Sequence, residues 1–598
     1  MLNNWSEADG YGENAGQWAM NDVSEAVSAA REYDRSLFPA RSLWRALELH
    51  PLLRFYRRQP PAGTPADFAC NALEELDISV KLSGTAKDAV PAQGPLLLAA
   101  NHPFGGVEGL VLAAWAAKLR PDLKIIANEM LCRIPELRPL IIGVNVFKGK
   151  GGADNISGLR AALAHLESGG ALALFPSGVV SHWHREARRV IDPKWNPLVG
   201  RLARVAGASV VPLYFEGRNS LVFQAAGYVH PGLRTLLLPG ELWCLRGNEV
   251  RLRIGEKVEP DLLSALRNDT ARAAYIRARC YALGRTDVRK AKRVEAIADE
   301  SGREALLKEI QSLPPERLLA EEGKFRTFYV NGKESPHILR EIGRLRERAF
   351  RAIQEGSGKA LDLDRFDPHY THLIVWDRRA GAVAGGYRAR SLSSLTPPGT
   401  MKTLYTASLF RFKREFFERC GTSMELGRAF VTPEYQRDYA PLLMLWKGIG
   451  RFAAETRTRT LFGPSSIGLG YTPESIFMLR QHLEECCGIP ELAALVRGRR
   501  APRPFSGPNA PDAHGLEYRV LDRAVRGLEG DKGLPILFKH YLQLGGRIAA
   551  FHEDRKFGTL DALMVVDLTS APEKLLLRYM GEERLRMLRL AHNSLQRP

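Results

Sequence analysis

Short apolar runs alternate with helix-like segments in two regions of this chain, and this alternation constrains the fold more than any other feature. In the first region the apolar runs are residues 96–100, 123–127, 140–147, 171–175 and 209–215. Runs of this length between amphipathic segments are typical of buried strands in a sheet that helices cover. The first region therefore predicts an α/β domain.

The second region predicts another α/β domain, with strands at residues 372–376, 382–388, 423–431 and 460–463. Residues 497–511, rich in Arg, Pro and Gly, predict a loop inside this domain. The segment between the two regions is charged, which predicts a helical linker. We expect four parts: a polar N-terminal arm (1–45), the first α/β domain (46–285), the linker (286–324) and the second α/β domain (325–598).

The composition excludes several classes of protein. The chain has 598 residues, of which 45% are hydrophobic and 25% are charged, a balance that excludes a largely disordered protein. Its seven cysteines show no CxxC spacing, which argues against a disulfide scaffold or a zinc ribbon. No apolar run reaches the roughly 18 residues of a membrane-spanning helix, and the start lacks a signal-peptide pattern. We expect a cytoplasmic protein that is not integral to a membrane.

The formal net charge of +18 predicts an anionic partner, which is nucleic acid, anionic lipid or an acidic protein. Aromatic and basic residues are not interleaved as on a single-strand platform, so nucleic acid is the least favoured of the three. Residues 42–58 form an amphipathic stretch that contains Trp44 and Tyr56. Such a helix either lies in a membrane interface or packs on its own domain.

His102 follows the first predicted strand almost directly, and Glu108 comes shortly after it. A carboxylate that orients an imidazole allows the ring to act as a general base toward a hydroxyl group. An Asn-His pair after a strand also occurs in ordinary turns, so these residues alone leave both interpretations open.

Three further blocks follow His102, at residues 143–147, 174–181 and 210–214. Their order and spacing resemble the glycerolipid acyltransferases, the lysophosphatidic acid acyltransferase superfamily, over about residues 90–260. The resemblance implies an O-acyltransferase in which His102 and Glu108 are catalytic. It also implies substrate contacts from Asn101, Lys148, Phe175, Pro176, Ser177 and Gly178.

The sequence departs from that family at two places. The family's acidic residue follows the histidine after four intervening residues, a position that Val107 occupies here, so we expect Gly105 and Gly106 to absorb one extra residue. The Glu and Arg of the family's third block, which help to hold a glycerol phosphate, are replaced by Ser177 and Val180. We therefore expect a lipid acceptor without a phosphate group.

Two other interpretations of this region are disfavoured. Ser177 lacks the preceding glycine that the nucleophile elbow of a hydrolase requires, because Phe175 stands there. His182 and His184 flank Trp183 without the partners of a metal site, so we expect no metal.

Two charged residues, Glu425 and Arg428, interrupt the predicted strand at residues 423–431. A carboxylate in apolar surroundings acquires a raised pKa and is then able to take a proton from an amine, directly or through water. The alternative is a structural ion pair between the two residues.

The blocks around Glu425 resemble the ornithine N-acyltransferase family, often labelled hemolysin-like, over about residues 325–580. They include residues 361–367, 385–388, 461–466 and 534–541. The resemblance implies a GNAT-like mixed sheet and transfer of a 3-hydroxyacyl group from acyl carrier protein to the α-amine of ornithine, without a further cofactor. It implies Glu425 as the base or the amine-orienting acid, and it places Arg388, Arg428 and Arg437 in substrate binding, at a carboxylate or at the pantetheine phosphate.

Two features leave the amino acid open. Pro464 and Ser465 replace the Cys and Ala that the family has after its Phe-Gly pair, so we expect a different pocket. Asp362, Asp364 and Asp367 either attract a cationic amino acid or form a solvated loop, and we favour the loop.

The whole chain resembles the bacterial bifunctional ornithine lipid synthases. In that interpretation residues 325–598 act first, and residues 46–285 then acylate the hydroxyl of the resulting lyso-lipid. The expected partners are acyl carrier protein, which is acidic, and lipid bound peripherally at the inner face of the cytoplasmic membrane. The alternatives are the same chemistry on lysine, glycine, serine or glutamine, and a catalytically decayed protein that binds lipid at a membrane surface.

Overall fold

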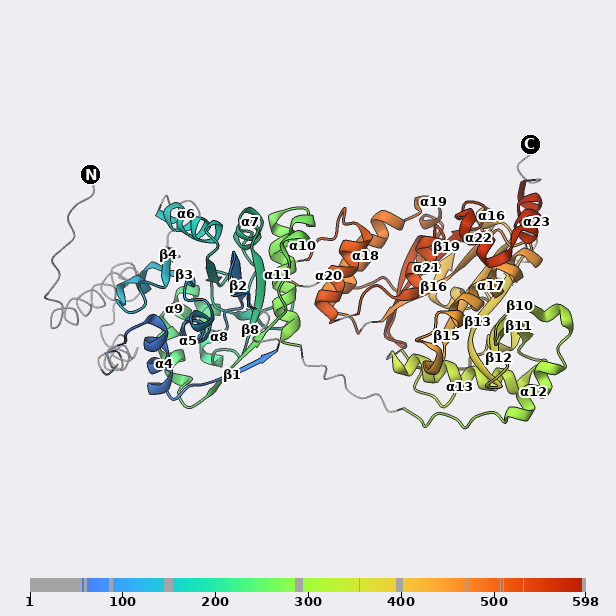
Figure 1. The fold of residues 1–598 in the computed structure, drawn as a ribbon, viewed down its shortest axis with the longest axis horizontal. Helices are drawn as coiled ribbons and strands as arrows, with labels where there is room; N and C mark the ends of the chain where they lie inside the picture. The colour runs from blue at the N-terminus through green and yellow to red at the C-terminus, as the bar shows by residue number, and fades with distance from the viewer. Residues whose placement is uncertain are drawn as a thin grey trace. The chain divides into compact units, whose positions relative to one another are not determined.

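The structure is a computed structural model that describes Tyr56, Arg58, Gly399 and residues 62–84, 90–144, 154–285, 294–353, 355–393, 402–468, 470–505, 507–508, 510–530 and 532–593. Lys148, the arm at residues 1–45 and most of the amphipathic stretch at 42–58 lie outside the described residues. Contacts group the chain into two compact units, residues 1–287 with 505–531 and residues 288–504 with 532–598. Each unit contains its own large sheet (Figure 1).

The first unit is built on a seven-stranded sheet with the order β1-β9-β8-β2-β5-β3-β4. All neighbouring strands run parallel except β8 and β9, which are antiparallel. The five strands predicted from apolar runs are all present, as β2, β3, β4, β5 and β8. The bounds are β1 (Ser79–Gly84), β2 (Leu96–Ala100), β3 (Lys124–Asn128), β4 (Ile141–Val144), β5 (Ala171–Leu174), β8 (Ser209–Glu216) and β9 (Glu249–Ile254).

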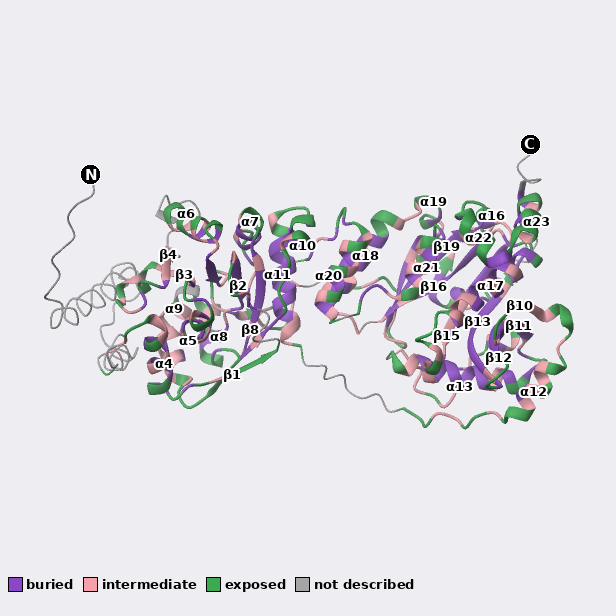
Figure 2. Ribbon diagram, in the orientation of Figure 1, coloured by how far each residue is buried: buried purple, intermediate pink, exposed green. Residues whose placement is uncertain are grey.

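Helices cover the two faces of this sheet. Leu96 and Leu98 of β2 belong to one core with α4 and α5, and the alternation of side chains turns Leu97 to the opposite face, where α11 contacts β2 and β8. The central strands β2 and β5 are buried between these layers, whereas β1 at one edge is mostly exposed (Figure 2). The helices are α4 (Pro65–Glu75), α5 (Val107–Leu119), α6 (Asp154–Glu167), α7 (Leu198–Val205), α8 (Leu221–Val229), α9 (Pro231–Cys244), α10 (Pro260–Ala265) and α11 (Asp269–Leu283).

A helix from late in the chain completes the first unit. α20 (Tyr518–Glu529) packs on α10 and α11. The hydroxyl of Tyr275 donates to the carbonyl oxygen of Ala524 at 3.0 Å, and Arg523 pairs with Asp261 at 2.7 Å. Residues 505–531 therefore belong to the first unit although residues on either side of them belong to the second.

The second unit is built on an eight-stranded mixed sheet with the order β10-β11-β12-β13-β15-β16-β19-β18. Only β15 and β16 are parallel neighbours in it. The strands are β10 (Leu318–Glu322), β11 (Phe325–Asn331), β12 (Thr371–Asp377), β13 (Ala382–Leu392), β15 (Ser423–Val431), β16 (Thr460–Gly468), β18 (Arg547–Asp554) and β19 (Thr559–Asp567).

The parallel pair diverges within the sheet. The ladder between β15 and β16 ends at Glu425 and Phe462, after which β15 continues beside β13 and β16 continues beside β19. α17 (Ala440–Glu455) packs on β10 to β13, and α13 (Pro336–Ala352) contacts β13 and β15. The opening between the two strands therefore begins beside Glu425.

The predicted fold class, two α/β domains of which the second has a mixed sheet, is confirmed. One local prediction is wrong, because the segment expected as a loop at 497–511 begins in a strand. β17 (Val496–Gly498) pairs antiparallel with β14 (Phe410–Phe412). In the described part of the chain, none of the helices combines the length and the apolar character needed to cross a bilayer.

Candidate active sites

The loop between β2 and α5 carries His102, and Asn101 fixes the start of this loop. The Asn101 amide donates to the carbonyl oxygen of Phe215 in β8 at 2.9 Å and accepts from the N–H of the same residue at 2.6 Å. Because Asn101 is 3% exposed and its amide is occupied in this way, its observed contacts are structural.

Glu108 lies in the first turn of α5, in a nest of backbone N–H groups. Its carboxylate accepts from the backbone of Phe104 at 2.6 Å, of Gly105 at 3.1 Å and of Gly106 at 3.0 Å. Gly105 has φ +97°, a conformation that other residues rarely adopt, and the loop accommodates its extra residue there. The longer spacing is therefore compatible with contact, since Nδ1 of His102 lies 3.2 Å from Oε1 of Glu108.

The two side chains shift each other's ionisation. Burial favours the neutral imidazole, but the charge of Glu108 outweighs it and raises the pKa of His102. Burial also opposes the Glu108 carboxylate, yet His102 and the backbone donors lower the pKa of Glu108. If Nδ1–H of His102 faces the carboxylate, the lone pair lies on Nε2, which has no hydrogen-bond partner among the described residues.

The third block forms a tight turn against the imidazole. The ring of Phe175 stacks on that of His102, with centroids 4.3 Å apart and an interplanar angle of 25°. The N–H of Gly178, at φ +66°, donates to the carbonyl oxygen of Phe175, and the hydroxyl of Ser177 donates to the carbonyl oxygen of Val179 at 2.7 Å. Pro176 is buried in this turn. Phe175 thus holds the imidazole plane of His102, the candidate catalytic base.

Asp192 is part of this site, and no motif in the sequence pointed to it. Its Oδ1 accepts from the backbone N–H of His102 at 3.2 Å and from the hydroxyl of Ser181, and its Oδ2 accepts from the indole of Trp195 at 2.8 Å. The carboxylate is fully buried, and its charge also raises the pKa of His102. Asp192 therefore holds the histidine loop through the backbone of His102, whereas Glu108 contacts the side chain.

His182 and His184 have contacts typical of an ordinary hairpin. Nδ1 of His182 lies 3.1 Å from the carbonyl oxygen of Val180, and Nδ1 of His184 accepts from the N–H of Ala187. No grouping of three His, Cys, Asp or Glu side chains that fits a metal ion occurs within the described ranges.

In the second unit, Glu425 is 1% exposed and both of its carboxylate oxygens are occupied. The hydroxyl of Tyr370 donates to Oε2, and the N–H of Thr406 donates to Oε1 at 2.5 Å. The Tyr370 oxygen in turn accepts from the N–H of Tyr405 at 2.8 Å. Glu425 is therefore linked through Tyr370 to the segment that carries Tyr405.

The three aspartates predicted as a solvated loop form a buried ionic network instead. Asp362 and Asp367 are 3% and 1% exposed. Arg346 pairs with Asp367 at 2.8 Å, and Arg388 pairs with Asp364 at 2.8 Å and with Asp367 at 3.0 Å. Burial opposes ionisation of Asp367, but the two guanidinium groups hold its pKa below its ordinary value. The prediction was wrong because arginines from α13 and β13 neutralise the loop.

Arg428 is held differently from Arg388. Its guanidinium lies 5.1 Å from the ring centroid of Tyr405 and 4.6 Å from that of Phe557, while the nearest paired carboxylates are 3.6 and 3.7 Å away. Its Nε has no hydrogen-bond partner among the described residues, and its backbone has φ +52°. Strained backbone of this kind clusters at functional sites. Arg437, by contrast, is exposed in the loop before α17.

Two acidic side chains that the sequence analysis missed lie at the end of β16. Asp561 is opposite Ser466 in the β16–β19 register and accepts its hydroxyl at 2.7 Å. The carboxylate of Glu355 lies against Gly468 and has no hydrogen bond or ion pair with a described residue, while its backbone N–H donates to the carbonyl oxygen of Phe350 at 2.8 Å. Burial and the charge of Asp561 raise the pKa of Glu355 to about 7, and burial raises that of Asp561 to about 6. Neither carboxylate forms an ion pair with a described residue, although the charge of Arg428 opposes part of the rise in the pKa of Asp561.

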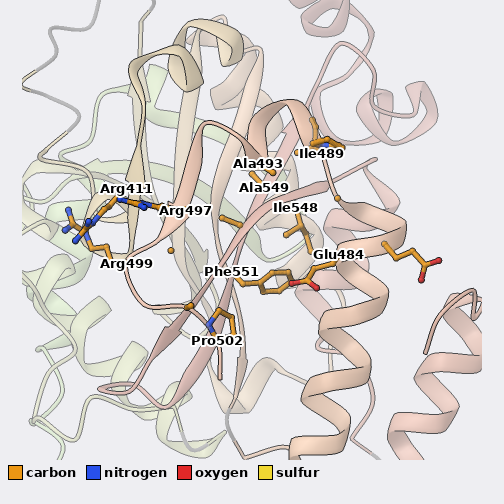
Figure 3. A pocket seen from close by; sticks show the side chains of 16 residues that line it. Arg411, Glu484, Ile489, Ala493, Arg497, Arg499, Pro502, Ile548, Ala549 and Phe551 are labelled. Carbon is orange, nitrogen blue, oxygen red and sulfur yellow. The ribbon is translucent and has the colours of Figure 1, made fainter. Parts of the chain in front are cut away.

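A cavity of about 790 Å³ lies beside the edge strand β18 (Figure 3). Its floor includes Ile548 and Phe551, and Figure 3 shows arginines gathered on one side of it. Arg411 of β14 and Arg497 of β17 are directly opposite each other, and neither forms an ion pair with a described residue. Like charges at directly opposed positions are destabilising, so this wall of the cavity favours an anion.

Comparison with known proteins finds acyltransferases for a region of each unit. The family model described as "Acyltransferase" matches residues 41–287, and the model described as "Acetyltransferase (GNAT) domain" matches residues 345–447. A glycine N(alpha)-acyltransferase of Bacteroides thetaiotaomicron is 37% identical over 38% of this chain and 71% of its own length. The chain belongs to the bifunctional N- and O-acyltransferases.

Two further relatives represent the two activities of this family separately. A lyso-glycine lipid O-acyltransferase of Phocaeicola vulgatus is 29% identical over 26% of this chain and 54% of its own length. An L-ornithine N(alpha)-acyltransferase of Rhodobacter capsulatus is 27% identical over 40% of this chain and 88% of its own length. The protein is thus an acyltransferase that acts on amino-acid and lipid substrates.

Proposed function

We propose that this acyltransferase makes an ornithine lipid in two steps. Residues 325–598 transfer a 3-hydroxyacyl group from acyl carrier protein to the α-amine of ornithine, and residues 46–285 then acylate the hydroxyl of this lyso-lipid. The observation that carries the proposal is the imidazole of His102, held by Glu108 at Nδ1 and stacked on Phe175, in the same chain as the Glu425 site.

In the O-acyl step, Nε2 of His102 takes the proton of the acceptor hydroxyl while the hydroxyl oxygen attacks the thioester carbonyl. A C–O bond forms as the C–S bond breaks, and the proton passes from the imidazolium to the leaving thiolate. Glu108 stabilises the imidazolium, because its own pKa is low and it is ionised when the proton arrives. Ser177 and Val180 supply no cation for a phosphate, which supports a lipid acceptor without one.

In the N-acyl step, the ammonium of the amino acid first loses a proton and its nitrogen then attacks the thioester. Glu425 is the proposed acceptor of that proton. The hydroxyl of Tyr370 donates to the Glu425 carboxylate, so Tyr370 would relay the proton from the ammonium to Glu425. A C–N bond forms, the C–S bond breaks and the thiolate leaves with a proton. This role for Glu425 agrees with its place where β15 and β16 diverge.

The contacts around Tyr405 fit an amino acid with a cationic side chain. Arg428, which stacks on Tyr405 and has a free Nε, suits the α-carboxylate. Glu355 and Asp561 suit the side-chain ammonium, because a cation would relieve the repulsion between them. Ornithine carries both groups.

Glycine is the second candidate amino acid. The relatives from Bacteroides thetaiotaomicron and Phocaeicola vulgatus that carry a glycine N(alpha)-acyltransferase name are 37% and 28% identical to this chain. A glycine substrate would use Arg428 and Glu425 in the same way and would leave Glu355 and Asp561 without a ligand.

The proposed donor is acyl carrier protein, with no further cofactor. An acidic carrier is complementary to the net charge of +18, and the wall formed by Arg411 and Arg497 is a matching surface beside a cavity with an apolar floor. We propose peripheral attachment to the inner face of the cytoplasmic membrane, where both lipid products would be released.

Mass spectrometry of lipids from a host without aminolipids tests the proposal. We expect an ornithine lipid with the wild type, accumulated lyso-lipid with His102→Ala, and neither lipid with Glu425→Gln, which keeps the shape of the buried side chain. A lipid that contains glycine would change the assigned amino-acid substrate from ornithine to glycine and would still support both acyl-transfer steps. No new lipid from any of the three proteins, all expressed and folded, would refute the proposed function.

A further inference from the structure

An apolar surface without cover lies on α8 and the adjacent hairpin of the first unit. The hairpin consists of β6 (His182–His184) and β7 (Arg189–Ile191). Leu221, Val222 and Val229 of α8 are 77%, 67% and 79% exposed, and Trp183 of β6 is 40% exposed. We call these four residues, with the lining residues of the small cavity described next, the α8–hairpin patch.

The hairpin and α8 meet at a small cavity. A cavity of about 290 Å³ is shared by Trp183, Val190, Arg218, Leu221, Gln224 and Ala225. The N–H of Trp183 donates to the side chain of Gln224 at 3.0 Å, which ties the hairpin to α8. Trp183 and Val190 are opposite each other in the hairpin, so both side chains lie on one face of it.

The helix α8 presents an apolar stripe to solvent while its inner face is already satisfied. Leu221, Ala225 and Val229 are spaced four residues apart and are all exposed, whereas Phe223 is fully buried on the other side. Apolar residues at this spacing normally mark the face that packs on a partner. No described element of the first unit covers this stripe.

Basic residues border the patch. Arg185, Arg188, Arg189 and Arg218 are exposed, and none of them forms an ion pair with a described residue. Glu186, in the turn of the hairpin, is the acidic residue among them. Exposed Trp and Leu side chains on the same elements as exposed arginines have the chemistry of a surface that enters the interface of an anionic bilayer.

Both elements of the patch are attached to the histidine loop. Ser181, which precedes β6, donates its N–H to the carbonyl oxygen of His102 at 2.7 Å. Asn219, just before α8, donates its side-chain amide to the carbonyl oxygen of Phe104 at 3.1 Å. Whatever binds the patch is therefore presented beside the loop of His102 and Glu108.

We infer that the α8–hairpin patch seats the first unit on the surface of an anionic lipid bilayer, with the His102 loop beside the membrane. The inference rests on the proposed O-acylation in one respect: the lipid whose hydroxyl group is deprotonated by His102 resides in the membrane. Seating lets a lyso-lipid reach Nε2 without leaving the bilayer entirely.

Vesicle sedimentation of the full chain tests the inference, with vesicles of phosphatidylcholine alone and of equal parts phosphatidylcholine and phosphatidylglycerol. We expect binding to the anionic vesicles, weakened about tenfold by Leu221→Ser with Val222→Ser and by Arg185→Gln with Arg188→Gln. The matched control is Met587→Ser with Leu590→Ser on α23 (Glu582–Asn593), where the side chains are 58% and 63% exposed, and it should bind as the wild type does.

Tryptophan fluorescence locates the contact with the bilayer, and the oligomeric state shows whether a second copy covers the patch instead. Bromine-labelled lipid should quench the wild type more than Trp183→Phe. Equal vesicle binding by the wild type and both patch variants would overturn the inference. A wild type that is dimeric in solution, with monomeric patch variants, would assign the patch to a second copy instead.

Activity separates the inference from the proposed function. On a short-chain lyso-lipid below its critical micelle concentration the patch variants should retain wild-type O-acyl transfer, and on vesicle-borne lyso-lipid they should lose about tenfold. Loss on both substrates would mean that the patch supports the fold of the site rather than a membrane contact. Patch-dependent vesicle binding without any O-acyl transfer by the wild type would leave the inference standing and refute the proposed function.

Discussion

Nδ1 of His102 lies 3.2 Å from Oε1 of Glu108, although the spacing between the two residues is one longer than in the family that the sequence resembles. The backbone nest around Glu108 makes this contact possible, because it holds the carboxylate under the ring. The contact raises the pKa of His102 and lowers that of Glu108. These two shifts determine how the rate of O-acyl transfer should depend on pH.

Glu108→Gln should lower kcat of O-acyl transfer by about 10²-fold or more, because the imidazolium loses its counter-charge. The base is active only when neutral, so the rate rises with pH through the pKa of His102. Since Glu108 raises that pKa, the acidic limb of the kcat/KM profile should shift to lower pH in the variant. An unshifted limb would contradict the assignment of His102 as the base that Glu108 orients.

Gly105→Ala should damage the same site through the backbone. Gly105 has φ +97°, and an added Cβ would lie 2.5 Å from Leu238 and 2.9 Å from Val180. We expect a loss of about 1–3 kcal/mol of stability and a large loss of O-acyl transfer. Gly106→Ala is the matched control, because its Cβ would meet nothing within 4 Å. Thermal unfolding and O-acyl assays of both variants check this, and equal effects would refute the role of the Gly105 conformation.

Much of this fold was predictable from the sequence, because buried strands such as β2 and β15 coincide with local apolar runs. The membership of α20 in the first unit was not predictable. The hydrogen bond between Tyr275 and Ala524, which attaches α20 to this unit, joins residues that are 249 positions apart in the sequence. No local pattern distinguishes such a helix from its sequence neighbours in the second unit.

The candidate sites show the same division. His102 and Glu425 stand in blocks that resemble known families, whereas Asp192 and Glu355 stand in no recognisable motif. Asp362, Asp364 and Asp367 were predicted to form a solvated loop, and this prediction was wrong because the arginines that pair with them come from other elements. Long-range charge pairing of this kind cannot be deduced from one segment.

Arg388→Met should destabilise the second unit by about 3–5 kcal/mol, because it leaves the buried Asp367 with Arg346 as its one ion-pair partner among the described residues and removes the closer partner of Asp364. Arg388 is 1% exposed and pairs with Asp364 and Asp367. The exposed Arg437 is the control, and Arg437→Met should change stability by less than about 0.5 kcal/mol. Urea unfolding checks the pair, and a stable Arg388→Met protein would show that the network tolerates the uncompensated charge.

Arg411→Glu and Arg497→Glu should each lower kcat/KM for N-acyl transfer about tenfold when the acyl group is bound to acyl carrier protein. With the N-acetylcysteamine thioester of the same acyl group, which lacks the acidic carrier, the rates should be unchanged. Arg586→Glu, an exposed charge reversal on α23, should affect neither donor. Equal losses with both donors would assign the arginines to the fold or to the acyl chain rather than to the carrier.

Glu355→Gln should distinguish ornithine from glycine as the substrate. Because the pKa of Glu355 is raised to about 7, the KM for ornithine should fall as the pH rises through that value and the carboxylate ionises. The variant should raise the KM for ornithine about tenfold and remove this pH dependence, because the ammonium loses a charged partner.

The contribution of Glu355 to stability depends on pH in the opposite direction from its contribution to ornithine binding. A carboxyl whose pKa is raised by folding stabilises the protein below its unfolded pKa, and this contribution is lost as the pH rises through the folded value. The melting temperature of the ligand-free wild type should therefore fall between about pH 4 and pH 7 more steeply than that of the variant. Added ornithine should reverse the fall in the wild type only. A variant with unchanged KM for ornithine, or an ornithine effect that glycine reproduces, would remove Glu355 from the amino-acid site and favour glycine.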